Sequence, residues 1–160
     1  MKKNNEKKIN RSIKLLKCNI NISPFSLKKI GVSKTVILSK IKKIGGELNL
    51  INCEFNLIVC NDPAIKKLNK KYRNIDMPTD VLSFEMNEFC EETECKILGD
   101  IFISIDTVKR QAAEYGISTT EEFFRMLIHG LLHLTGMTHK TDSDYKKMMK
   151  LNENILTGIL

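Results

Sequence analysis

The residues best suited to chemistry lie between Arg125 and His139, RMLIHGLLHLTGMTH, a stretch that holds all three histidines of the 160-residue sequence. Residues four apart on an α-helix lie on one face about 6 Å apart, so His129 and His133 can direct their imidazoles at one point. Gly136 can take the positive φ that ends a helix, and the chain can then turn back with His139. Three neutral imidazoles suit one zinc ion and leave a fourth tetrahedral position for water, as in a catalytic site.

The spacing of the three histidines separates a metal site from an ordinary buried histidine. A single histidine on an apolar helix is more often a satisfied core residue, but H-x3-H-x5-H with an intervening glycine is much more specific. Metzincin peptidases share this spacing and place a glutamate, their general base, directly after the first histidine. This chain has Gly130 there. The sequence therefore predicts a metal hydrolase and disfavours a peptidase of that kind.

Length and composition predict one cytoplasmic domain that spans residues 1–160. Hydrophobic residues make up 42% and charged residues 28%, as in ordinary globular proteins. No apolar run approaches the ~20 residues that a membrane span needs, and the N-terminus lacks the apolar block of a secretory signal. The five cysteines are scattered without C-x-x-C spacing, which indicates reduced thiols in a cytosolic protein.

Charge is distributed unevenly along the chain. Residues 1–43 contain 13 Lys and Arg against one acid, a net charge of +12, whereas residues 44–160 carry a net charge of −5. A basic segment beside a mildly acidic body favours an anionic partner, nucleic acid above all. A solvated, lysine-rich arm is the alternative, and we expect residues 1–17 to be frayed or weakly helical.

The elements around the histidines predict an α+β fold. Strands are expected at 18–23, where Pro24 interrupts the run, and at 56–60, 79–86 and 98–105, with an acidic loop at 87–95. Helices are expected at 33–44, after the turn at 61–63, from an Asp106 cap to Tyr115, from a Ser118-x-x-Glu121 capping box through the histidines, and at 143–156. The histidine helix is apolar over most of its circumference. We therefore expect a small mixed sheet of about four strands packed with helices, with the histidine helix buried at the centre.

Two of the expected helices carry further predictions. The helix at 33–44 should face inward with Val36, Ile37, Ile41 and Ile44 and close at Gly45 and Gly46. The helix after 61–63 should place an apolar side against the body and a basic side toward solvent. The apolar residues are Ile65, Leu68 and Tyr72, and the basic residues are Lys66, Lys67, Lys70 and Lys71.

Three blocks of this sequence resemble one known family. IHGLLHLTGMTH resembles the H-G-x-L-H-L-x-G-x-x-H signature of the YbeY-type endoribonucleases, the bacterial ribosomal RNA maturation factors. LNKKYRNIDMPTDVLSF (68–84) and LGDIFIS (98–104) resemble two further blocks of that family, in the same order, and Met149 and Glu153 stand where its closing helix has them. The resemblance runs from about Leu57 to Leu156 and is loose in the basic first third.

The resemblance implies a zincin-like fold and a single-strand-specific, metal-dependent endoribonuclease. Such proteins act in the maturation of small-subunit ribosomal RNA and in ribosome quality control, so ribosomal RNA and the small ribosomal subunit are the implied partners. The implied ligands of one zinc ion are His129, His133 and His139, and the family's active-site arginine falls on Arg73. Two departures matter, because Met137-Thr138 replaces the family's Tyr-Asp and Glu85 replaces a proline. The first removes a carboxylate beside the metal site, from which a weaker metal site or slower chemistry could follow.

The chemistry can also be argued from the residues themselves. Zinc held by three histidines lowers the pKa of its water to about 7, and negative charge that develops on phosphoryl oxygens needs a fixed cation such as a guanidinium. Arg73 is the hypothesis for that cation, against the alternative of an ordinary surface arginine. Asp80 and Ser83 are candidates to orient a histidine or line the cleft, although Asp80 also fits a turn before a strand.

The basic residues of the helix after 61–63 are the candidates for binding RNA. The lysines at 66, 67, 70 and 71 are candidates to track an RNA backbone, or else form a solvated helix face, and no aromatic-rich platform for stacking bases stands out in the sequence. Two other functions stay open at this point. One is a ribosome-assembly factor whose metal is mainly structural, and the other is a metal-dependent hydrolase of another substrate such as peptide.

Overall fold

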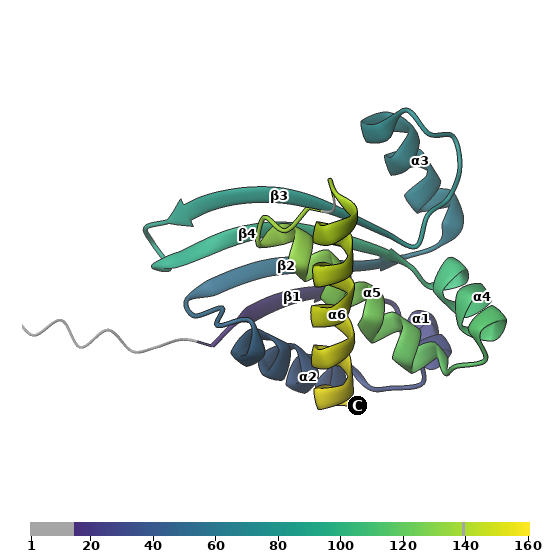
Figure 1. Cartoon of the computed structure of the whole chain (residues 1–160), viewed down its shortest axis with the longest axis horizontal. Helices are drawn as coiled ribbons and strands as arrows, with labels where there is room; N and C mark the ends of the chain where they lie inside the picture. The colour runs from purple at the N-terminus through teal and green to yellow at the C-terminus, as the bar shows by residue number, and fades with distance from the viewer. Residues whose placement is uncertain (1–14, 139) are drawn as a thin grey trace, which may run out of the picture.

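A four-stranded mixed sheet with helices packed against it forms the body of the molecule (Figure 1). The computed structural model describes residues 15–138 and 140–160. The strand order is β1-β2-β4-β3, in which β1, β2 and β4 run parallel and β3 lies antiparallel to β4 at one edge. The strands are β1 (Lys17–Asn21), β2 (Cys53–Cys60), β3 (Val81–Cys90) and β4 (Cys95–Ser104). The predicted α+β class with about four strands is confirmed.

Buried and partly exposed side chains alternate along β2, so one face of the sheet is turned toward the core. Every second side chain of β2 is buried, and Phe55, Leu57 and Val59 all belong to the main hydrophobic cluster. Successive side chains of a strand point to opposite faces, so this pattern places the cluster on one side of the sheet. Ile101 and Ile103 of β4 belong to the same cluster.

Helix α5 (Thr119–Leu134) lies against this face of the sheet and is the buried centre of the fold. The Ser118 hydroxyl accepts from the backbone N–H of Glu121 at 3.0 Å and caps the first turn. Phe123, Phe124 and Leu127 are fully buried, as are most of the apolar residues farther along the helix. The predicted position of the histidine helix is therefore confirmed.

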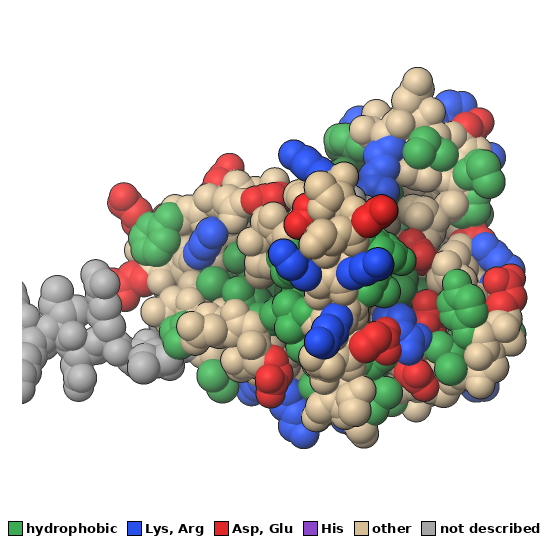
Figure 2. All heavy atoms as spheres, in the orientation of Figure 1, with side chains coloured by type: hydrophobic (Ala, Val, Ile, Leu, Met, Phe, Trp, Pro, Cys, Tyr) green, Lys and Arg blue, Asp and Glu red, His purple; other side chains and the backbone are tan. Residues whose placement is uncertain are grey.

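The remaining helices surround this centre. They are α1 (Pro24–Ile30), α2 (Lys34–Glu47), α3 (Asp62–Arg73), α4 (Ile105–Tyr115) and α6 (Asp142–Ile159). Helix α6 packs on α5, while α3 stands out from the body at the end of the sheet where β2 and β4 finish (Figure 1). On the face seen in Figure 2, basic and acidic side chains are interspersed over α6, so no continuous basic path crosses the described residues of that face.

One arginine ties α5 to α6. Arg125 donates to Glu122 at 2.5 Å and Glu121 at 3.0 Å on its own helix, and to Glu153 of α6 at 2.7 Å. Glu122 is buried, and that burial raises the pKa of its carboxyl even though Arg125 acts to lower it. The helix that carries the histidines is thus fixed to the helix that follows them.

The first third of the chain differs from prediction in two places. The strand ends at Asn21, and the Ser23 hydroxyl caps a short helix that begins at Pro24, where only an interruption was predicted. Helix α2 continues through Gly45 and Gly46 to Glu47, because Gly45 allows close packing on Leu16: a Cβ at position 45 would lie 2.6 Å from the Leu16 Cβ.

The N-terminal segment and one inward-facing residue also need correction. Residues 1–14 lie outside the described part, but Leu16 is buried and β1 begins at Lys17, so the end of the predicted frayed segment is ordered. Val36 was predicted to face inward and is 38% exposed, because it lies in the first turn of α2 beyond the edge of the core.

The hairpin and the start of α4 were also predicted incorrectly. Strand β3 runs to Cys90 and β4 begins at Cys95, so only 91–94 form a turn where an acidic loop from 87 to 95 was predicted. Residues 85–89 of β3 are all exposed, and that exposure removes the alternation of buried and exposed residues by which a strand is recognised. The cap of α4 is Ser104 and not Asp106, which lies in the first turn. No helix in the described part of the chain is long and apolar enough to cross a membrane.

Candidate metal centre and active-site cleft

The two described histidines converge from successive turns of α5. Their Nε2 atoms lie 3.1 Å apart, and their ring centroids are 4.7 Å apart at an interplanar angle of 79°. Both rings therefore present the same nitrogen to one point, as the i, i+4 spacing of His129 and His133 predicted. The structure brings these two side chains together.

The turn after α5 determines which ring nitrogen of His133 carries the proton. Gly136 has φ of 89°, its N–H donates to the carbonyl of His133 at 2.9 Å, and the N–H of Met137 donates to the carbonyl of Leu132 at 3.1 Å. This pair of bonds is a Schellman motif, which requires the left-handed conformation that glycine adopts easily. It places the carbonyl of Met137 3.0 Å from Nδ1 of His133. Since a carbonyl can only accept, Nδ1 carries the proton, and Nε2 of the neutral ring keeps its lone pair.

This arrangement fits two ligands of one metal ion. Two nitrogens held at about 2.0–2.1 Å by a tetrahedral zinc ion are separated by roughly 3.3 Å, close to the 3.1 Å between the two Nε2 atoms. His139, the third predicted ligand, lies outside the described residues. Within residues 15–138 and 140–160, no group of three or more His, Cys, Asp or Glu side chains is placed to hold a metal.

A cleft of about 290 Å³ opens beside the two histidines. It lies between the C-terminal end of α3, the start of β3 and the middle of α5. The residues that line it are Arg73, Thr79, Asp80, Val81, Ser83, His129 and His133. Arg73, Asp80 and Ser83 were singled out from the sequence, and the structure places them in one cleft with the two histidines. Thr79 and Val81 were not predicted as site residues, although both belong to the family-like block at 68–84.

Gly130 forms the contact between the histidine helix and the sheet. A Cβ at this position would lie 2.9 Å from Cγ2 of Ile101 and 3.1 Å from Oγ of Ser83. The Ser83 hydroxyl donates to the carbonyl of Gly130 at 3.3 Å. Position 130 therefore faces the sheet at close range, and the glutamate of a peptidase would not fit there. Ser83 holds the helix as well as lining the cleft.

Asp80 is held by its neighbours in the way a turn residue is held. Its Oδ1 accepts from the backbone N–H of Val81 at 2.7 Å and from the hydroxyl of Thr79 at 3.1 Å. Its Oδ2 accepts from Gln111 of α4 at 3.0 Å. Asp80 thus has the turn role that was the alternative prediction, and it also lines the cleft. No sequence signal pointed to Gln111, because only the packing of α4 brings it to Asp80.

The lysines of α3 lie outside the cleft. Nζ of Lys66 and of Lys70 lies 3.6 and 3.2 Å from the Asp76 carboxylate, and Lys67 is exposed. Tyr72 was predicted on the apolar side of this helix but is 56% exposed. Ile65 is buried as predicted, and the second buried residue is Asn69. The Asn69 amide donates to the carbonyl of Met77 at 2.8 Å and so ties α3 to the loop that leads into β3.

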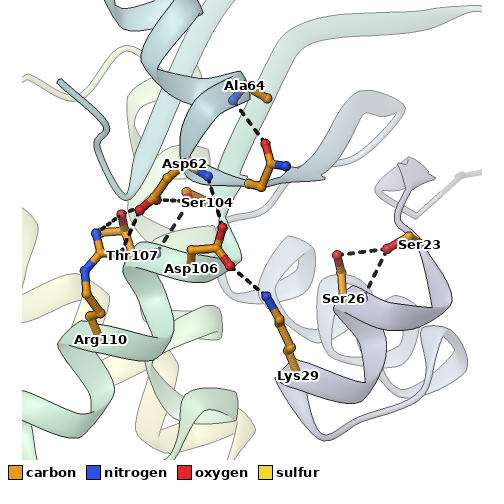
Figure 3. A network of polar contacts seen from close by, with 10 residues as sticks. Ser23, Ser26, Lys29, Asp62, Ala64, Ser104, Asp106, Thr107 and Arg110 are labelled. Carbon is orange, nitrogen blue, oxygen red and sulfur yellow. Dashed lines mark hydrogen bonds and ion pairs between the residues drawn. The ribbon is translucent and has the colours of Figure 1, made fainter. Parts of the chain in front are cut away.

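A second polar cluster lies at the same end of the sheet, where β2 and β4 lead into α3 and α4 (Figure 3). Asp62 accepts hydrogen bonds from Ser104 at 2.5 Å, Thr107 at 2.7 Å and Arg110 at 2.7 Å. Burial acts to raise the pKa of Asp62, but these hydrogen bonds outweigh it and hold the pKa below its ordinary value.

Asp106 belongs to the same cluster and links α1 to it. One oxygen of its carboxylate accepts from Lys29 at 2.7 Å and the other from the backbone N–H of Asp62 at 3.2 Å. The Lys29 ammonium holds the pKa of Asp106 below its ordinary value. Each of these carboxylates is engaged on both oxygens, so the cluster joins helices to one another.

Comparison with known proteins identifies a single family. A family model described as Endoribonuclease YbeY matches residues 19–159. A Treponema denticola protein named Endoribonuclease YbeY is 43% identical over 119 residues, which cover 72% of this chain and 77% of the relative. An Aquifex aeolicus protein of the same name is 43% identical over 134 residues, which cover 84% of this chain and 88% of the relative.

A solved structure supports the fold. The solution structure of a Thermotoga maritima protein matches with a TM-score of 0.58 at 23% identity, over 91% of this chain and 89% of that one. At this identity the match concerns the fold alone. The predicted likeness to zincins stays a prediction.

Proposed function

This chain belongs to the Endoribonuclease YbeY family, and we propose that it is a metal-dependent endoribonuclease specific for single-stranded RNA. Its proposed task is the maturation of small-subunit ribosomal RNA and ribosome quality control in the cytoplasm. The observation that carries the proposal is the convergence of Nε2 of His129 and of His133, 3.1 Å apart, in a cleft that Arg73 also lines.

The proposed metal ligands are His129 and His133, with His139 as the third. Neutral imidazole nitrogens are ligands that zinc prefers, and one zinc ion per chain is the proposed cofactor. When bound, such an ion supplies a Lewis acid that lowers the pKa of water and polarises a phosphoryl oxygen. The hydrogen bond from Nδ1 of His133 to the Met137 carbonyl orients that ring and keeps its Nε2 unprotonated.

The residues around the histidines have separate proposed roles. Arg73 binds the oxygens of the phosphate that is cut, because a guanidinium can donate two parallel hydrogen bonds to it. Asp80 is proposed to keep the polar edge of the cleft in place through its bonds to Thr79 and Gln111. Ser83 is proposed to fix the height of α5 above the sheet through its bond to Gly130.

The basic side of α3 is proposed to guide the RNA toward the cleft. Lys66, Lys67, Lys70 and Lys71 lie on the helix that ends in Arg73, and contacts of this kind give an affinity that falls with salt. The small ribosomal subunit and its RNA are the proposed partners. The cytoplasmic location is supported by the five cysteines, all of which are free thiols.

The enzyme and the assembly factor with a structural metal make different predictions for Arg73→Ala. An enzyme should lose about 100- to 1,000-fold in kcat on single-stranded RNA, because a fixed cation is removed from the developing charge. Metal content, circular dichroism and melting temperature should be unchanged. Arg73→Lys should restore only part of the rate, since an ammonium cannot donate the same paired bonds.

Controls make this test specific. Lys109→Ala removes one charge from an exposed position on α4 and should leave the rate unchanged. Removal of the metal with a chelator should abolish cleavage, and added zinc should restore it. Cleavage that persists in both Arg73→Ala and the chelated protein would contradict the proposal, and cleavage of unstructured protein would favour the peptidase.

A further inference from the structure

Tyr72 forms the exposed end of a row of three aromatic rings. Its ring centroid lies 4.8 Å from that of Phe84 at 60°, and Phe84 meets the ring of Phe102 edge-on at 5.8 Å and 81°. Phe84 and Phe102 are both half-buried, whereas Tyr72 is 56% exposed. The Tyr72 ring is therefore supported by Phe84 and partly exposed to solvent, so a planar ligand can stack on it.

Two members of this row of rings are chain neighbours of residues that line the cleft. Tyr72 precedes Arg73 and Phe84 follows Ser83, and both Arg73 and Ser83 line the cleft. Neighbouring side chains of a strand point to opposite faces, so Ser83 faces α5 and Phe84 faces outward across the edge strand β3. Tyr72 and Arg73 both belong to the last turn of α3, so a strand that places one phosphate at Arg73 and crosses that turn would bring a neighbouring nucleotide to the Tyr72 ring.

A cation accompanies the exposed ring. Nζ of Lys71 lies over the ring of Tyr72, 4.9 Å from its centroid, and its flexible stem allows it to move aside toward a phosphate when a base stacks there. In the described part of the chain Lys71 has no carboxylate within ion-pair distance, whereas Lys66 and Lys70 both pair with Asp76. An exposed aromatic face beside an available ammonium can bind the base and the phosphate of one unpaired nucleotide.

We propose that Tyr72 stacks an unpaired nucleobase next to the phosphate that is cut, and that Lys71 binds the phosphate of that nucleotide. The inference rests on the proposed endoribonuclease function and adds a substrate-binding residue to it. In duplex RNA each base is already stacked and paired, so the Tyr72 ring has no free face to bind. Stacking on Tyr72 thus gives a physical reason for the choice of single-stranded RNA.

A second aromatic ring in this chain provides a matched control. Phe25 is 67% exposed and has Nζ of Lys29 4.5 Å from its centroid. Lys29, however, is paired with Asp106 at 2.7 Å, and Phe25 lines a separate cavity beside α1. Exposure and a nearby lysine are thus shared by both rings, and of the two only Tyr72 adjoins the catalytic cleft.

The first test measures cleavage of a single-stranded RNA oligonucleotide by Tyr72→Leu, Tyr72→Phe and Phe25→Leu. Leucine keeps apolar contact with Phe84 but has no π-face, so we expect KM to rise about 5- to 150-fold. kcat should stay within about two-fold, because this contact is made equally in substrate and transition state. Tyr72→Phe should behave as the unchanged protein, and so should Phe25→Leu. An unchanged KM in a folded Tyr72→Leu protein would overturn the proposal.

The second test combines the Tyr72→Leu variant with a missing base. An abasic nucleotide is placed at successive positions of the oligonucleotide, and the Kd is measured by fluorescence anisotropy. The unchanged protein should lose about 5- to 150-fold in affinity at one position, and Tyr72→Leu should show no further loss there. Equal losses in both proteins at every position would overturn the stacking. The Kd can be measured whether or not the protein cleaves RNA. Absence of RNA cleavage would therefore refute the proposed function, whereas the Kd values would still test the stacking on Tyr72.

Discussion

The structure contains two polar clusters at one end of the same sheet, and they are built in opposite ways. In the cluster around Asp62, each carboxylate oxygen accepts from a neighbour, and the partners come from α1, α3, α4 and the end of β4 (Figure 3). In the cleft, Nε2 of His129 and of His133 and the side chain of Arg73 instead face a shared space of about 290 Å³.

The difference shows how a structural cluster can be told from a candidate site. Groups that satisfy one another hold elements together, because leaving any one of them buried and unpaired would cost free energy. Groups that point into a cavity are oriented by partners behind them, as the Met137 carbonyl orients His133 and Gln111 holds Asp80. The first cluster should therefore govern stability and the second should govern chemistry.

The largest expected effect is that of His133→Ala. Loss of a ligand should release the metal and reduce the rate of RNA cleavage more than about 100-fold, since even partners behind a ligand are worth 10- to 100-fold. The fold should persist, as judged by circular dichroism. The measurement pairs metal analysis of the purified protein with the cleavage rate.

The matching variant in the other cluster is Arg110→Ala. It removes a partner of Asp62 that donates at 2.7 Å and should lower the melting temperature without loss of metal or of cleavage rate. A loss of cleavage in a folded Arg110→Ala protein would show that the two clusters are not separate. Retention of metal and of rate in His133→Ala would contradict the assignment of His133 as a metal ligand.

A smaller effect is expected at Gly130, which connects the cleft to the sheet. Alanine there would push its Cβ to 2.9 Å from Ile101 and 3.1 Å from Ser83, so we expect a loss of about 1–2 kcal/mol in the free energy of unfolding. Gly158 of α6 is the control, because a Cβ there meets nothing within 4 Å. Gly158→Ala should be neutral or stabilise by up to about 1 kcal/mol. Denaturant unfolding of both variants provides the measurement, and equal effects would contradict the packing argument.

The effect of Asp62→Asn on stability should be similar in size at neutral pH, and it depends on pH. Because the pKa of Asp62 lies below its ordinary value of 3.8 in the folded protein, its charge stabilises the fold above that value. The contribution is lost as pH falls through the folded-state pKa. We expect Asp62→Asn to lower the free energy of unfolding by about 1–2 kcal/mol at pH 7 and by progressively less below pH 4.

Asp76→Asn is the control for this pH dependence, since Asp76 is exposed and only bridges surface lysines. Its effect on the free energy of unfolding should be much smaller at every pH. A difference between Asp62→Asn and the unchanged protein that stays constant from pH 7 to pH 3 would contradict the assignment.

Several elements were predictable because their signals are local. Ser118 caps α5, and Gly136 ends its final turn in a Schellman motif. The four-residue spacing of His129 and His133 brings their rings together with no help from the rest of the fold. Each of these features depends only on backbone geometry within a few residues.

The errors arose where distant segments decide the outcome. Gly45 resembles a helix terminator in sequence, but it lies inside α2, where a Cβ would lie 2.6 Å from the Cβ of Leu16. Tyr72 has the spacing of a buried residue, yet Asn69 takes the buried place because a carbonyl of the next loop lies within its reach. Asp106 was predicted as a cap and instead receives Lys29 from α1, 77 residues away in sequence.

The sequence by itself determined the chemical identity of the cleft: two imidazoles one turn apart, a glycine that turns the chain back, and family blocks that include Arg73. Only the tertiary structure decided that Arg73, Asp80 and Ser83 lie beside these rings and that Tyr72 is left exposed. The physical reason is the separation in sequence of the residues that interact. Helix periodicity and capping act over a few residues, whereas the packing of β3 against α5 joins Ser83 to Gly130, 47 residues apart in the chain.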